Sequence, residues 1–331
     1  MARAATTDLQ PSPGSTGTDI GTVWVDAAYL ARLAYSVQGL AFLPRQPRAS
    51  VLAGRHASRM RGRGLNFEEL RGYLPGDDVR HIDWKASLRT GHPLVRVYTE
   101  ERDRPVLVVV DQRMSMFFGS RRALKSVVAA ELAALAMWIA LQAGDRVGAV
   151  IFNDSDTQLV RPLRSRARVH GALGELARMN QALHAGSASR PVPGQLDRAL
   201  ESALRLAPHD CLVCVVSDFS GATPRSRQLL RQLSAHNDVI AALVFDPLAR
   251  APHPGRERLV VTEGDLQVEL DMGASAVREP IEKFFSGRLV EVAELLRHSG
   301  VPMMAFDTEA STLEQLRRFL GRRPVQGRAH G

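Results

Sequence analysis

The stretch "VLVVVD" (Val106–Asp111) is a continuous apolar run that ends in a carboxylate. A strand that is buried on both faces of a parallel sheet has this composition, because helices cover both sides and no alternate position meets water. The run therefore predicts a central strand of an α/β fold, with Asp111 at its carboxyl end.

Strand and helix patterns alternate from this stretch toward the C-terminus. Further strands are expected at Val147–Phe152, Cys211–Asp218, Val239–Asp246 and Met303–Asp307, and helices near 120–143, 167–183, 195–206 and 276–298, with a last helix after Asp307. Alternating residues on both sides of Gly264 and Asp265 predict a hairpin. The alternation indicates an open, mainly parallel sheet with helices on both faces. Such sheets bind ligands at the carboxyl ends of their strands, where Asp111, Asp218 and Asp246 fall.

The composition is that of a soluble globular protein of about two domains. The chain has 331 residues, of which 45% are hydrophobic and 24% charged, so a core can form without disulfides or metal. Formal net charge is +8, and only three of the 43 basic residues are lysine. The basic stretches Arg45–Arg63 and Arg161–Arg168 are not interleaved with aromatic residues. Nucleic acid is therefore an unlikely partner, although a nucleic-acid-binding module is kept as an alternative; an acidic protein surface or plain solvent fits these stretches as well.

Cysteine usage and hydropathy predict a cytoplasmic protein. Cys211 and Cys214 lie at i and i+3 of an expected strand, which places them on opposite faces and argues against a redox or metal pair. The sequence contains no other cysteine, and no signal peptide is expected. The longest apolar run, Val127–Ala143, contains Glu131 and is shorter than the ~20 residues of a bilayer span. It predicts a buried core helix and no transmembrane segment.

Four regions are expected along the chain. Residues 1–22 are poor in large apolar side chains and predict disorder. Residues 23–104 form an N-terminal segment, which begins with helical spacing over 23–42 and is expected to pack against the sheet domain. Residues 105–321 form the α/β domain, and 322–331 a flexible tail.

The segment "YLPGDDVRHIDW" (Tyr73–Trp84) mixes acidic and basic residues with a tryptophan. One interpretation is a metal-dependent hydrolase or nuclease that uses the carboxylates of Asp77–Asp83. The other is an ion-paired clamp that joins the N-terminal segment to the α/β domain, because each acid has a candidate cation close by. The sequence favours the clamp, whose expected members are Glu69, Arg71, Asp77, Asp78, Arg80, Asp83, Trp84 and Arg89.

The loop "DQRMSM" after the first core strand resembles the metal-ion-dependent adhesion site of von Willebrand factor A domains. There a D-x-S-x-S motif, with a Thr and an Asp from other loops, holds a divalent cation. Here Ser115 matches the second Ser and Asp218 the later Asp, but Arg113 replaces the first Ser and the Thr position falls near Gly194. We expect Arg113 to stand in for the metal by neutralising Asp111 and Asp218. A cation such as Mg²⁺, if bound, would use Asp111, Ser115 and Asp218; no cofactor is expected. The alternative is that Arg113 points to solvent and Asp111 only caps the following turn.

A longer resemblance combines both motifs. The run "GRGLNFEELRGYLPGDDVRHIDW", with Arg89, the Arg96–Glu101 stretch and "PVLVVVDQRMSM", resembles a prokaryotic family catalogued as domain of unknown function number fifty-eight. That family is linked with MoxR-type AAA+ ATPases, and the resemblance covers roughly Gly54–Gly321. It implies a von Willebrand A-like fold and a non-catalytic adaptor that works with such an ATPase to assemble or activate client proteins. The partner face would be Asp111, Arg113, Ser115 and Asp218.

Overall fold

The computed structural model describes residues 20–42, 65–74, 79, 82–100, 104–184, 192–249, 258–263, 266–271 and 275–320. The chain divides into two compact units. The smaller comprises Leu52–Arg104, and the larger comprises the residues before and after it. Residues 20–42 therefore belong to the larger unit, together with the sheet domain.

A six-stranded sheet forms the centre of the larger unit, with the strand order β10-β7-β6-β3-β4-β5. Its strands are β3 (Pro105–Asp111), β4 (Arg146–Phe152), β5 (Thr157–Leu163), β6 (Leu212–Ser217), β7 (Asp238–Phe245) and β10 (Met303–Asp307). Every neighbouring pair is parallel except β4 and β5. The mixed α/β class and the mainly parallel sheet are confirmed. The predicted hairpin is also present, as β8 (Arg258–Glu263) and β9 (Leu266–Asp271).

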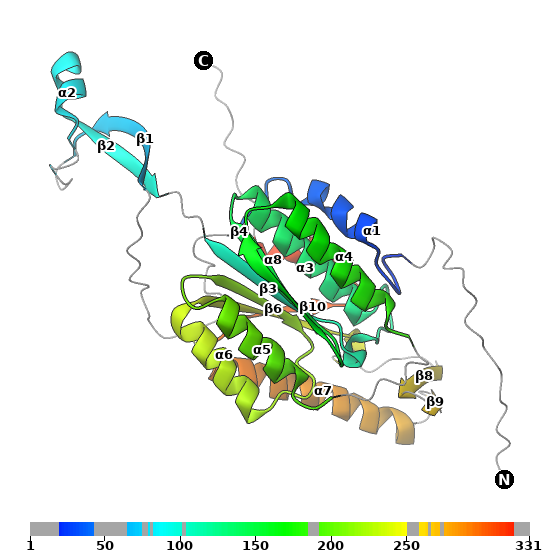
Figure 1. Cartoon of the computed structure of the whole chain (residues 1–331). Helices are drawn as coiled ribbons and strands as arrows, with labels where there is room; N and C mark the ends of the chain where they lie inside the picture. The colour runs from blue at the N-terminus through cyan, green and yellow to red at the C-terminus, as the bar shows by residue number, and fades with distance from the viewer. Residues whose placement is uncertain are drawn as a thin grey trace, which may run out of the picture. The chain divides into compact units, whose positions relative to one another are not determined.

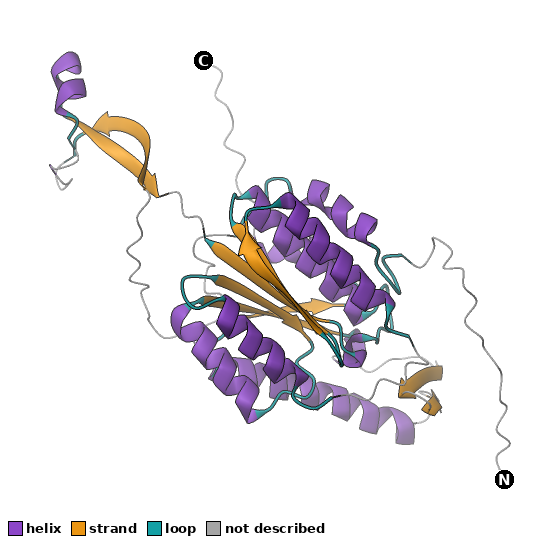
Figure 2. Cartoon of the chain, in the orientation of Figure 1, coloured by secondary structure: helices purple, strands orange, loops and turns teal. Residues whose placement is uncertain are grey.

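Helices cover both faces of the sheet (Figures 1 and 2). One face carries α3 (Lys125–Gln142), α4 (Arg166–Gln181) and α8 (Thr312–Leu320), and the other α5 (Gln195–Leu206), α6 (Pro224–His236) and α7 (Ser275–His298). Successive residues of β3 enter the two apolar clusters in turn: Val108 packs on the α3 side and Val109 on the α5 side. Cys214 and Cys211 likewise lie in different clusters, as the strand pattern predicts.

Helix α3 is the core helix that the apolar run predicts. It is long and apolar enough to cross a membrane by length and composition, but 83% of it is buried inside the protein. It begins at Lys125 and not near residue 120, because residues 117–124 form an irregular loop. In that loop a Cβ on Gly119 would lie 2.3 Å from the carbonyl oxygen of Ala123, so the close turn requires glycine.

Residues 20–37, which we call the N-terminal strap, pack against α3 and α4. Instead of one helix over 23–42, the strap contains α1 (Ala27–Arg32) and a 3₁₀-helix (Leu33–Val37). Asp26 sets the start of α1, because its carboxylate accepts a hydrogen bond from the Tyr29 N–H at 2.5 Å. Before α1 the chain instead forms a turn over residues 21–23, which the Gly21 N–H closes by donating to the carbonyl oxygen of Trp24 at 2.7 Å.

The smaller unit contains two strands and one helix. β1 (Leu65–Gly72) pairs antiparallel with β2 (Leu94–Glu100), and α2 (Trp84–Thr90) lies between them in the sequence. The only hydrophobic residue of this unit that is buried among the described side chains is Val95. The unit therefore has little core of its own.

Candidate functional site

The strand order places a topological switch point between the carboxyl ends of β3 and β6. The chain leaves β3 toward β4 on one side, whereas β6 pairs with β3 on the other side. The helix after β3 is α3 and the helix after β6 is α6, and these cover opposite faces. The two loops therefore part at adjacent strand ends, which is where open α/β sheets bind ligands. We call the residues gathered there, namely Asp111, Arg113, Ser115, Lys125 and Asp218, the switch-point cluster.

Arg113 folds back onto the carboxylate that ends β3. Its Nε lies 3.0 Å from Asp111 Oδ1 and its Nη2 2.6 Å from Asp111 Oδ2, a bidentate pair. Nη1 donates to the carbonyl oxygen of Ser220 at 2.9 Å, and the Ser217 hydroxyl donates to Asp111 at 2.6 Å. The side chain of Asp111 is fully buried and that of Arg113 is 10% exposed. Burial alone would lower the pKa of Arg113, but the charge and hydrogen bonds of Asp111 and the charges of Asp218 and Asp154 together outweigh it, and the pKa lies above its ordinary value.

Asp218 forms an ion pair with a second cation, Lys125. Lys125 Nζ lies 2.7 Å from Asp218 Oδ2, and Arg113 Nη2 lies 3.8 Å from Asp218 Oδ1. The Ser115 hydroxyl donates to the same oxygen at 3.4 Å, and the Ser220 N–H donates at 2.8 Å. Burial acts to raise the pKa of Asp218, but the charges of Lys125 and Arg113 bring it below its ordinary value. The carboxylate is therefore held in its charged form.

A third acid, Asp154, borders the cluster from the loop after β4. Its carboxylate accepts a hydrogen bond from the Met114 N–H at 2.6 Å. Burial raises the pKa of Asp154 above its ordinary value, although this hydrogen bond and the charge of Arg113 act in the opposite direction. Three acids and two cations thus nearly balance in charge.

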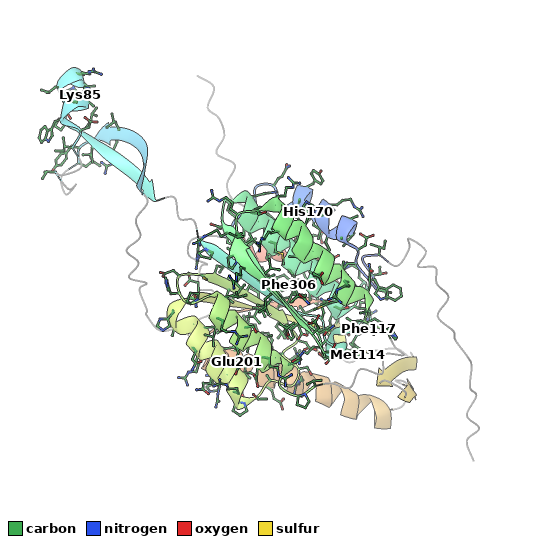
Figure 3. The ribbon with its side chains drawn as sticks, viewed as in Figure 1. Lys85, Met114, Phe117, His170, Glu201 and Phe306 are labelled. Carbon is green, nitrogen blue, oxygen red and sulfur yellow. The ribbon has the colours of Figure 1, made fainter. Side chains whose placement is uncertain are left out.

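The loops around the cluster combine apolar side chains with strained backbone. Met114 and Phe117, both half-buried, come from the loop after β3 (Figure 3). In the loop after β6, buried Phe219 adopts a φ of 53°, which is rare for a residue with a Cβ. Its N–H bonds to the Ser217 hydroxyl at 2.8 Å, which helps to hold this conformation. Strained backbone of this kind is concentrated at functional sites.

The structure brings together all four residues that the sequence assigns to the partner face: Asp111, Arg113, Ser115 and Asp218. The alternative in which Arg113 points to solvent does not describe this geometry. Sequence reasoning missed Lys125 and Asp154. Lys125 is one of only three lysines in an arginine-rich chain and is the first residue of the core helix, which is the one signal that could have pointed to it.

Metal binding is the first property to test, because the guanidinium of Arg113 and the ammonium of Lys125 already pair with the carboxylates that would bind a metal ion. Among the described residues, no group of three or more His, Cys, Asp or Glu side chains is placed to hold a metal ion. Gly194, near which the resemblance predicts the Thr of the adhesion site, precedes α5 and offers no side-chain oxygen. We expect titration calorimetry with Mg²⁺ or Mn²⁺ at millimolar concentration to give no binding heat. A binding heat that Asp111→Ala abolishes would overturn this prediction.

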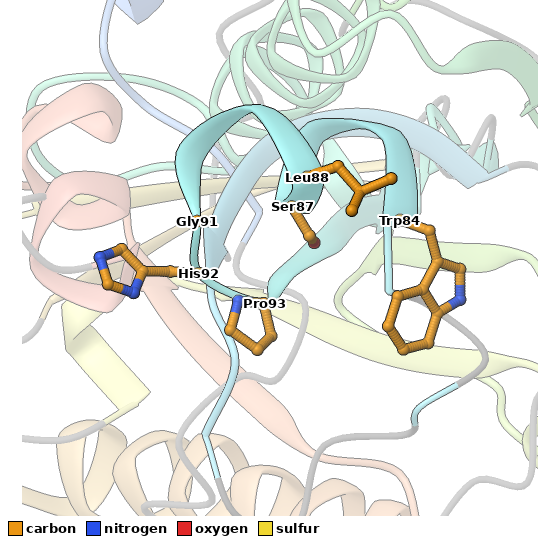
Figure 4. A pocket seen from close by; sticks show the side chains of 6 residues that line it. All are labelled: Trp84, Ser87, Leu88, Gly91, His92 and Pro93. Carbon is orange, nitrogen blue, oxygen red and sulfur yellow. The ribbon is translucent and has the colours of Figure 1, made fainter.

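The motif of the smaller unit is described in part. Asp83 caps α2 by accepting a hydrogen bond from the Ala86 N–H at 3.0 Å, and Arg89 lies in the last turn of that helix. Trp84 is 66% exposed and lines an open hollow of about 280 Å³ with Ser87, Leu88, Gly91, His92 and Pro93 (Figure 4). Arg71 lies in β1, where it donates to the Gly72 carbonyl at 3.1 Å. Asp77, Asp78 and Arg80, and the side chain of Glu69, lie outside the described residues. The clamp and the hydrolase that would use these acids both stay hypotheses.

The chain is similar to known proteins over most of its length. A family model described as a protein of unknown function, DUF58, matches residues 69–287. Uncharacterized proteins of Mycobacterium tuberculosis and Mycobacterium bovis are each 30% identical over 293 residues, which is 88% of this chain and 90% of theirs.

Two solved structures share a weaker similarity. The conserved hypothetical protein BatB from Bacteroides thetaiotaomicron matches with a TM-score of 0.39 and 13% identity, over 65% of this chain and 95% of that one. An aerotolerance-related membrane protein from Bacteroides fragilis matches with the same score and identity, over 66% and 98%. These scores are too low to carry an argument.

Proposed function

This chain belongs to the DUF58 family of proteins of unknown function, and we propose that it is a non-catalytic adaptor of the von Willebrand A-like type that binds other proteins at the switch-point cluster. The observation that carries the proposal is the bidentate pair between Arg113 and Asp111 at the sheet's topological switch point. In a metal-binding adhesion loop the metal ion neutralises the acids. Here the guanidinium of Arg113 takes that role, so the charges balance without a metal.

The same pairs argue against hydrolysis at this cluster. A metal-dependent hydrolase needs carboxylates that are free to coordinate a cation, and the cation then activates water. Here Asp111 is engaged by Arg113 and Ser217, and Asp218 by Lys125. A metal ion that approached these carboxylates would be repelled by the positive charges of Arg113 and Lys125. Recognition of a partner is the chemistry that this arrangement supports.

The loop after β3 supplies the surface for that recognition. Met114 and Phe117 add apolar area beside the paired charges of the switch-point cluster, and Met and aromatic residues are enriched at protein interfaces. The motif that resembles the MoxR-linked family suggests the partner: a MoxR-type AAA+ ATPase in the cytoplasm, with which the adaptor assembles or activates client proteins.

Binding to the purified MoxR-type ATPase from the same organism tests this proposal, with and without ATP. We expect nucleotide-sensitive binding, and we expect Met114→Asp to weaken it at least about tenfold, since a charge in an apolar contact costs more than ~1.4 kcal/mol. Val290→Asp is the matched control, because Val290 is 60% exposed on α7, a helix of the α5–α6 face. No binding in any nucleotide state, or equal effects of the two substitutions, would contradict the proposal.

A further inference from the structure

The N-terminal strap is hydrogen-bonded directly to the segment that carries Lys125, and through Asn180 to the segment that carries Arg113. We infer that strap docking and partner binding at the cluster are coupled, so that the strap regulates the cluster. This inference rests on the proposed function for the identity of the bound partner, but the structural coupling itself can be measured without any partner.

The first connection runs through two buried amide side chains. The Val25 N–H donates to Asn180 Oδ1 at 2.8 Å, and Asn180 Nδ2 donates to Gln112 Oε1 at 2.9 Å. Gln112 Nε2 in turn donates to the carbonyl oxygen of Ser126 at 3.0 Å. Val25, Asn180 and Gln112 are all fully buried. Gln112 stands between Asp111 and Arg113 in the chain, so its side chain helps to fix the backbone from which the arginine folds back.

The second connection reaches the lysine. The carbonyl oxygen of Thr22 accepts a hydrogen bond from the Leu124 N–H at 2.9 Å. Leu124 is the N-cap of α3 and provides no side-chain cap, so the strap supplies a backbone partner where the helix begins. The next residue is Lys125, which pairs with Asp218. The strap therefore contacts the lysine-bearing segment directly and the arginine-bearing segment through Asn180.

The strap is anchored along its length to α3 and to the segment that follows α4. The Tyr29 hydroxyl donates to the buried carboxylate of Glu131, and Trp138 Nε1 donates to the carbonyl oxygen of Leu30 at 3.0 Å. Trp24 Nε1 donates to the carbonyl oxygen of Leu183 at 3.2 Å. A helix of six residues has little stability alone. The strap therefore depends on these anchors and can open as a local unit while the sheet stays folded.

Opening of the strap has a direct cost at the cluster. It leaves the buried Asn180 carbonyl and the Leu124 N–H without their partners, and it frees Gln112 and Leu124 to move. The Arg113–Asp111 and Lys125–Asp218 pairs would then lose part of their support. By linkage, a partner that binds the ordered cluster favours the docked strap. A ligand that pulls the strap away lowers the affinity for the partner, and the partner lowers the affinity for that ligand by the same ratio.

Hydrogen exchange on the isolated full-length chain tests the coupling with a matched pair of substitutions. Tyr29→Phe removes the anchor to Glu131, whereas Tyr35→Phe removes the same hydroxyl from a residue that is 73% exposed. We expect Tyr29→Phe to accelerate exchange about tenfold or more at strap amides and also at residues 112–118, since a hydrogen bond to a charged group is lost. Tyr35→Phe should change neither region, and α5 should keep its wild-type rates in both variants.

Each result of the exchange experiment supports or overturns the coupling. Faster exchange in the strap with no change at 112–118 would overturn the coupling. A uniform increase that includes α5 would also overturn it, because the strap would then not open as a separate unit. Failure of the proposed function has a different signature: wild-type protein would not bind the ATPase, while the exchange result would stand. If wild type binds, Tyr29→Phe must weaken that binding, or the regulatory role is wrong.

Discussion

Replacing Arg113 with leucine is expected to lower the free energy of unfolding by about 3–5 kcal/mol, the typical cost of removing one partner from a buried ion pair. The effect is large because the side chain of Asp111 is fully buried and that of Arg113 is 10% exposed, so water cannot replace the guanidinium. The carbonyl oxygen of Ser220 would lose a donor as well. Urea unfolding at neutral pH, followed by circular dichroism, measures the change.

Two further proteins show whether the loss comes from the stranded charge. The double variant Asp111→Asn with Arg113→Leu should lose less stability than the sum of the single variants, because the neutral amide does not need a cation. Arg225→Leu is the surface control: its ion pair with Glu201 is about half exposed, and such pairs contribute at most ~1 kcal/mol. An Arg113→Leu protein as stable as wild type would show that the pair at the switch point does not hold the site.

Replacing Lys125 with methionine is expected to cost about 1.5–3 kcal/mol at pH 7, as for the loss of a hydrogen bond to a charged group. The cost should depend on pH. The pKa of Asp218 in the folded protein lies below its ordinary value, so its charge contributes stability above about pH 4. That stability is lost as the pH falls through the folded pKa. Because protonated Asp218 does not need Lys125, the difference between wild type and variant should shrink at pH 3.

The measurement is urea unfolding of both proteins at pH 7 and pH 3. Asp154 contributes in the opposite direction, since its folded pKa is raised and it disfavours the folded state at neutral pH, but it is present in both proteins and cancels in the difference. Lys125→Arg keeps the charge and should retain most of the stability. A difference of equal size at both pH values would mean that packing of the lysine stem, and not its charge, accounts for the loss.

The buried strands are the part of the fold that sequence reasoning predicts well. β3 and β6 are covered on both faces, so every position selects an apolar residue and the run stands out. β5 escaped detection because it lies at the edge of the sheet, where Arg161 and Pro162 give the stretch the appearance of a loop. Helix α6 was also missed: it begins at Pro224, and most of its residues are polar or charged.

The candidate site was predictable as far as it depends on strand ends. Asp111 and Asp218 terminate adjacent parallel strands, so their proximity follows from topology alone, and Arg113 two residues away can reach either. Lys125 enters from the start of a helix, and its approach depends on the irregular loop of 117–124, which has no periodic pattern. The link from Val25 to Asn180 spans 155 positions in the chain and depends on tertiary packing, which no local pattern encodes.

The antiparallel edge strand has a consequence for how copies of this protein meet in solution. An open sheet edge is a template on which another chain can add a strand and begin a fibre. On β5 the register shifts opposite Val147 and Ala149, Pro162 has no N–H to donate, and Arg161 is exposed. A second sheet that approached this side would meet an interrupted ladder and a charge. Edge-to-edge polymerisation through β5 is therefore disfavoured.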